Sequence, residues 1–145
     1  MADIPHPHAG RARPLSPHLQ IYHWALTMVA SITHRITGVG LYLGVVFIAW
    51  WLVAASMGPD AYQPFVEAAT NPIGQIILFG FTWAAAYHLF NGIRHLAWDI
   101  GYGFLPKTAM WTGVIVIALS LVAAIGIFLW AHSPQSGVYR ADIYR

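Results

Sequence analysis

Three long stretches of this chain contain no Asp, Glu, Lys or Arg, and they constrain its fold more than any other feature. They cover residues 36–59, 68–93 and 108–139, which are 24, 26 and 32 residues long. A helix of about 20 apolar residues crosses the hydrocarbon core of a membrane. Only 8% of the 145 residues are charged, whereas a soluble domain carries about 25%. The sequence therefore predicts an all-α membrane protein with three transmembrane helices, preceded by a short interfacial segment.

Prolines and glycines between these stretches set the expected boundaries. Asn71-Pro72 is typical of a helix start, whereas Gly101 and Gly103 are typical of a helix end. We expect residues 58–73 to form a loop between the first two spans. The predicted organisation is a polar N-terminal and interfacial segment (1–27), a three-helix transmembrane domain (28–132, with spans at about 28–57, 72–100 and 108–131) and a polar tail (133–145).

Basic residues near the span ends predict the orientation. Arg11, Arg13 and Arg35 flank the start of the first span, and Arg94 and Lys107 flank the connection between the second and third. The connection between the first two spans has no Lys or Arg. By the positive-inside rule the N-terminus lies in the cytoplasm. The first ten residues show no basic segment followed by an apolar one, so we expect no cleaved signal. The prediction is a multi-pass protein of a bacterial cytoplasmic (inner) membrane, in contact with membrane lipid.

Composition also excludes several functions. The chain has no cysteine, so it holds no disulfide, thiolate metal site or iron–sulfur cluster of its own. Its net charge of +2 comes from scattered residues, which gives no basic patch for nucleic acid.

One polar stripe interrupts the second apolar stretch. At about 100° per residue on a helix, His88, Gly92, His95 and Asp99 fall within about 60° of one another. His88 lies near the middle of the expected span. Ionisable groups at membrane depth are costly, so they indicate a functional site.

The depth of these groups suits a haem. Because the first two spans run in opposite directions, His34, Arg35, Arg94 and His95 share one depth near the inner surface. His88 lies seven residues deeper, about 10 Å at 1.5 Å per residue. An imidazole could bind the iron, and cations above it could bind the propionates.

The chain offers only one histidine at that depth, so a haem with two histidine ligands needs the second from a partner helix. Gly92, one turn from His88, would let a flat macrocycle approach the backbone. The alternative is that His88 forms a hydrogen bond to a neighbouring helix and binds no cofactor.

A second candidate site lies on the first span. Ser31 and Arg35 are four residues apart and share a helix face, with His34 beside them. A hydroxyl and a guanidinium at the membrane boundary could bind the carbonyl oxygens of a quinone. Alternatively, Arg35 extends to lipid phosphates and Ser31 caps a turn.

Three stretches in this order, 13–22, 31–38 and 88–99, resemble the signature motifs of a known family. This is the cytochrome b556 subunit of succinate dehydrogenase, a membrane anchor of respiratory complex II. The motifs are most similar to those of mitochondrial and alphaproteobacterial members.

The resemblance implies specific roles. His88 would be one axial ligand and the metal-binding residue of haem b, with the other ligand supplied by the second membrane-anchor subunit. His34, Arg35 and His95 would surround the propionates. Ser31 and Arg35 would contribute to a ubiquinone site completed by the second anchor and the iron–sulfur subunit.

The implied function is that of an anchor subunit of succinate:ubiquinone oxidoreductase, in the respiratory chain and the tricarboxylic acid cycle. Succinate oxidation would take place on the flavoprotein subunit, so this chain has no catalytic residue of its own. One alternative is an anchor of a fumarate reductase or another b-type cytochrome complex. The other is a membrane scaffold without a cofactor.

Overall fold

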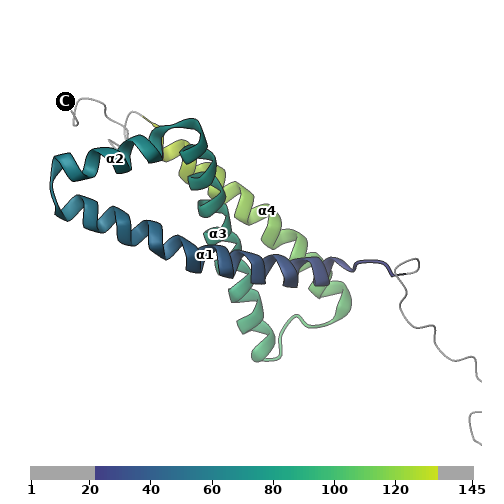
Figure 1. The fold of residues 1–145 in the computed structure, drawn as a ribbon. Helices are drawn as coiled ribbons and strands as arrows, with labels where there is room; N and C mark the ends of the chain where they lie inside the picture. Colours follow the sequence, from purple (N-terminus) through teal and green to yellow (C-terminus); the bar gives the residue numbers. More distant parts are fainter. Residues whose placement is uncertain (1–21, 134–145) are drawn as a thin grey trace, which may run out of the picture.

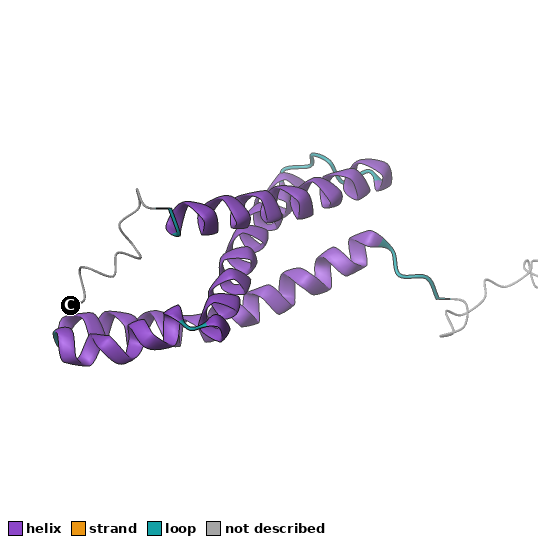
Figure 2. Cartoon of the chain, turned by 90° about the horizontal axis from the view of Figure 1, so that it is seen from above, coloured by secondary structure: helices purple, strands orange, loops and turns teal. Residues whose placement is uncertain are grey.

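A computed structural model describes residues 22–133, and these residues form four helices joined by short connections (Figures 1 and 2). The helices are α1 (Leu26–Ser56), α2 (Pro59–Thr70), α3 (Pro72–Asp99) and α4 (Pro106–Ala131). No strand occurs within the described residues. The predicted all-α class is confirmed.

Three of the helices are long and apolar enough to cross a membrane. They are α1, α3 and α4, with 31, 28 and 26 residues. At 1.5 Å per residue each is roughly 40 Å or longer, against about 30 Å of hydrocarbon. The prediction of three transmembrane helices is confirmed. Most of the predicted interfacial segment and polar tail lies outside the described residues.

The connection between the first two spans differs from the prediction. Residues 58–73 were expected to form a loop, but most of them form α2. Pro59 occupies the first turn and Asp60 stands at its N-terminus, where the helix dipole favours an acidic side chain. Aromatic contacts hold α2 against the end of α1: the rings of Trp50 and Phe65 lie 5.1 Å apart, edge to face. The polar composition of residues 59–70 did not predict a helix, because packing on α1 stabilises it.

Asn71 joins α2 to α3. Its side-chain oxygen accepts hydrogen bonds from the backbone N–H groups of Ile73 and Gly74 at 2.9 and 3.0 Å. Its side-chain nitrogen donates to the carbonyls of Glu67 and Ala68 at the end of α2. One side chain thus caps both helices and fixes the corner between them.

Helix α3 is the centre of the fold, because it packs extensively against both α1 and α4, which contact each other less (Figure 1). It crosses α1 in the antiparallel sense. Gly44 of α1 lies against Phe81, and Thr37 lies against His88, about two turns further along α3. A Cβ added at Gly44 would stand 1.9 Å from Cε2 of Phe81, so a glycine is needed for this close approach.

Small side chains on α4 let it lie close to α3. The buried positions of α4 recur every three or four residues, as expected for one face of a helix. They are Ala109, Gly113, Val116, Ser120 and Ala124. In a membrane, where lipid is as apolar as the helices, such stripes of small residues allow backbones to approach and pack.

The corner between α2 and α3 gives a first test of this fold. A Cβ at Gly74 would stand 1.9 Å from the backbone oxygen of Ala68, whereas one at Gly80 on the same helix would meet no atom within 4 Å. We expect Gly74→Ala to destabilise the helix bundle by about 1–3 kcal/mol, the usual cost of overpacking. Gly80→Ala should be close to neutral. Denaturation of the purified protein in detergent would measure both, and equal stability of the two variants would contradict the described corner.

Candidate functional site

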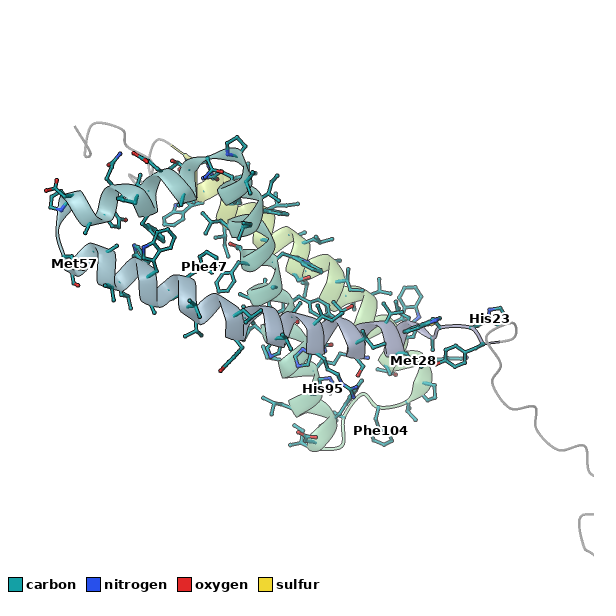
Figure 3. All side chains as sticks on the ribbon, viewed as in Figure 1. His23, Met28, Phe47, Met57, His95 and Phe104 are labelled. Carbon is teal, nitrogen blue, oxygen red and sulfur yellow. The ribbon has the colours of Figure 1, made fainter. Side chains whose placement is uncertain are left out.

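Three histidines from two helices meet where α1 crosses α3. The ring of His34 stacks on that of His88, with centroids 3.9 Å apart and planes 12° apart. The ring of His95 lies 5.3 Å from that of His34. Figure 3 labels His95 on α3, close to the crossing with α1. Residues 54 and 61 positions apart in the sequence are therefore brought together. The approach of His95 to His34 follows their predicted shared depth. The expectation that His88 lies about 10 Å deeper than His34 is wrong, because the two rings stack.

The ring of His88 is held by α1. The hydroxyl oxygen of Thr37 lies 3.3 Å from Nδ1 of His88, and the backbone at Gly38 lies so close that an added Cβ would stand 3.0 Å from Cε1. Sequence reasoning chose Gly92 as the glycine that allows a close approach and missed Gly38. The signal was present, because Thr37 and Gly38 lie one helical turn after His34.

His34 has a buried atom with unmet hydrogen-bonding capacity. Its Nδ1 has no hydrogen-bond partner among the described residues. Buried polar atoms are nearly always paired in folded proteins, so each exception calls for an explanation. A group bound beside His34 would supply one.

The prediction that Arg94 joins the cationic rim with His34, Arg35 and His95 is not what the structure shows. Arg94 is buried and faces α4. Its guanidinium donates to the carbonyl of Ala109 at 2.7 Å, to Thr112 Oγ1 at 3.0 Å and to Asn91 Oδ1 at 3.2 Å. The physical reason is angular: adjacent helix residues are about 100° apart, so Arg94 and His95 share a depth but not a face.

Trp98 connects the two faces of α3. The guanidinium carbon of Arg94 lies 4.0 Å from the centre of its ring, and the ring of His95 meets it edge to face at 4.9 Å. Its indole N–H donates to the carbonyl of Gly103 at 3.1 Å, in the turn after α3. Sequence reasoning gave this tryptophan no role, although it lies one turn beyond Arg94.

The two residues proposed for a quinone site lie at the start of α1. Arg35 is exposed and Ser31 is half-buried one turn earlier. Neither forms a hydrogen bond or an ion pair with another described residue, so their polar groups are available to a ligand or a partner. Asp99 is exposed at the end of α3.

The side chains around His88 fit a cofactor that itself supplies most of the ligands to its metal. Among the described residues no group of three or more His, Asp or Glu side chains could hold a bare metal ion. His88 is a single imidazole on a half-buried face, and a Cβ at Gly92, one turn away, would meet no atom within 4 Å. This donor set suits the iron of a macrocycle better than a free ion.

Comparison with known proteins agrees with this geometry. Residues 10–127 match the family described as the succinate dehydrogenase/fumarate reductase transmembrane subunit. The chain is 46% identical to a succinate dehydrogenase cytochrome b556 subunit of Paracoccus denitrificans, over 78% of this chain and 87% of the relative. It is 41% identical to that of Rickettsia prowazekii (81% and 90%) and 36% identical to the mitochondrial cytochrome b560 subunit of Sus scrofa (81% and 71%).

A three-span membrane protein with a histidine cluster at one helix crossing is the class that the fold and site define. The chain belongs to the succinate dehydrogenase/fumarate reductase transmembrane subunit family.

The buried position of Arg94 yields a second prediction. We expect Arg94→Gln to weaken the packing of α3 on α4 by about 1–3 kcal/mol, because the groups that it binds lose a charged donor. Arg35→Gln, at an exposed position, should leave stability unchanged. Thermal denaturation in detergent would compare the two. A stable Arg94→Gln variant with an altered cofactor spectrum would contradict this packing role and would support the earlier prediction that Arg94 lies beside the cofactor.

Proposed function

We propose that this chain is a membrane-anchor subunit of a succinate:ubiquinone oxidoreductase that binds haem b through His88 and helps to bind ubiquinone through Ser31 and Arg35. The observation that carries the proposal is the convergence of His34, His88 and His95 at the crossing of α1 and α3. Family membership supports it, because the relatives compared above are named cytochrome subunits of succinate dehydrogenase.

His88 is the residue proposed to bind the iron. It is half-buried inside a helix that can cross the membrane, and its ring is already held by Thr37, Gly38 and His34. A ligand fixed before binding loses less conformational freedom when it binds. Haem, when bound, would supply one-electron oxidation and reduction.

His34, Arg35 and His95 are the residues proposed to surround the propionates. His34 and His95 lie within ring contact, and Nδ1 of His34 is buried without a partner. A carboxylate accepts strong hydrogen bonds from such groups when they are charged or carry an N–H. Arg35 would supply a permanent cation at the membrane boundary.

A second ligand to the haem iron would come from the second anchor subunit. The remaining described histidines, His23 and His132, lie outside the helices at opposite ends of the described chain. Large apolar side chains are exposed along α1 and α4, among them Val46, Phe47 and Val122. These faces would meet lipid or the partner helices.

The quinone site is proposed to use Ser31 and Arg35. The Ser31 hydroxyl can donate a hydrogen bond to a carbonyl oxygen of the ring. The guanidinium of Arg35 can stabilise the negative charge that develops on that oxygen as the quinone is reduced. A fixed cation beside developing charge has this role in many enzymes. The second anchor and the iron–sulfur subunit would complete the site, and succinate would be oxidised on the flavoprotein subunit.

The orientation proposed is an N-terminus in the cytoplasm of a bacterial inner membrane. Arg35 and Lys107 lie towards one end of the antiparallel spans, whereas Asp60 and Glu67 lie on α2 at the other. This asymmetry follows the positive-inside rule. A fumarate reductase anchor would share this fold, but the named relatives favour succinate oxidation.

The iron-ligand role is tested by His88→Ala. We expect the variant complex to lose its haem, because the imidazole proposed to bind the iron is removed. His132→Ala, at the opposite end of the bundle, is the matched histidine control and should keep the haem. The ratio of haem to protein, measured by difference spectroscopy, decides the matter. A normal ratio in His88→Ala would exclude it as a ligand.

The quinone role is tested by Ser31→Ala and Arg35→Leu. We expect succinate-driven quinone reduction to fall, by about 10²–10³-fold for Arg35→Leu if it acts as a typical charge-stabilising donor. Succinate oxidation with a soluble dye should be unchanged, because that reaction bypasses the membrane site. Ser56→Ala, at the far end of α1, is the control. Equal loss in both assays would indicate failed assembly and contradict a quinone-specific role.

A further inference from the structure

Thr37 has a buried hydroxyl that lies against the ring of the proposed iron ligand. The residue is 5% exposed and faces α3 from the middle of the α1 contact. Its Oγ1 lies 2.9 Å from the carbonyl oxygen of His34 and 3.3 Å from Nδ1 of His88. A single hydroxyl therefore touches both the backbone of α1 and the ring of the proposed iron ligand.

Counting protons decides the direction of these two hydrogen bonds. A threonine hydroxyl carries one proton and can also accept. The carbonyl of His34 can only accept, and it is the closer partner, so the Thr37 proton goes to it. Towards His88 the same oxygen can then act only as an acceptor. Nδ1 of His88 must therefore carry a proton, and in a neutral imidazole this leaves Nε2 unprotonated.

Two neighbours keep the ring in the position where this hydrogen bond forms. His34 stacks on one face, with ring planes 12° apart. The backbone of Gly38 lies against the ring of His88, because a Cβ added at Gly38 would stand 3.0 Å from Cε1 of His88. Rotation of the His88 ring would disturb both contacts as well as the bond to Thr37.

We propose that Thr37 is a positioning residue that fixes His88 in the tautomer protonated at Nδ1 and leaves Nε2 as the nitrogen that binds iron. The inference rests on the proposed haem function and deepens it. A hydrogen bond from the far nitrogen of a ligating histidine orients the ring and raises its basicity, and its loss typically weakens binding about 10–100-fold. A more basic ligand favours ferric over ferrous iron, so Thr37 lowers the haem potential.

The test compares three variants in the purified complex. Thr37→Val removes the hydroxyl with little change of shape, and Thr37→Ser keeps the hydroxyl. Thr82→Val is the matched control, because Thr82 Oγ1 donates to the carbonyl of Leu78 at 2.8 Å on α3 and forms no hydrogen bond with a described histidine. Haem content and the midpoint potential of the haem are measured for each, by difference spectroscopy during redox titration.

We expect Thr37→Val to hold haem about 10–100-fold more weakly and to raise its potential, by about 59 mV for each tenfold loss of preference for ferric iron. Thr37→Ser and Thr82→Val should resemble the unmodified complex. The potential is a property of the haem that is bound, so a variant that assembles in low yield still reports it. Thr37→Ala gives a second hydroxyl-free variant, and its agreement with Thr37→Val separates loss of the hydroxyl from change of shape.

Two results would overturn the role of Thr37. One is a Thr37→Val complex that matches Thr82→Val in both haem content and potential. The other is a Thr37→Ser complex that shifts as far as Thr37→Val. Failure of the haem function itself is distinguishable, because the unmodified complex would then lack haem or His88→Ala would keep it. Loss of haem in His88→Ala with no effect of Thr37→Val removes only the present inference.

Discussion

Polar groups within a membrane must find partners inside the protein, and this constraint governs how α3 is surrounded. Lipid offers no hydrogen bonds, so an unpaired polar side chain at that depth costs several kcal/mol. Helix α3 carries two polar stripes, with centres roughly 80° apart on the helix. One contains His88 and His95 and faces α1, and the other contains Asn91 and Arg94 and faces α4. The need to cover both stripes explains why α3 lies between its two neighbours.

The two stripes have different neighbours. The guanidinium of Arg94 is paired within the chain, since it meets Ala109, Thr112 and Asn91, although Nδ2 of Asn91 is itself buried without a partner among the described residues. Against the histidine stripe, His34 of α1 has a buried Nδ1 that also lacks a partner among the described residues. A paired buried network fixes one packing arrangement. An incompletely paired one beside a half-buried His88 is suited to receive a bound group, which is the basis of the proposed haem site.

Much of this arrangement could be predicted from the sequence, and the misses have physical causes. Uncharged length alone gave the three spans, and antiparallel depth brought His34 to His95. The depth of Arg94 in the membrane did not predict which helix its side chain faces, because that depends on its angle around α3. The helix α2 was missed because aromatic packing on α1, at Trp50 and Phe65, outweighs its polar composition. The role of Thr37 depends on distances of a few tenths of an ångström, which no sequence pattern carries.

The central claim is that this chain holds a haem coupled to succinate oxidation. The most direct measurement is a reduced-minus-oxidised spectrum of the purified complex, with succinate as the only reductant. The account predicts a b-type haem band that appears on addition of succinate. A complex with no haem band, even with dithionite, would contradict the account and leave His88 as a packing residue held by Thr37. A band that appears only with dithionite would keep the cytochrome but contradict its coupling to succinate.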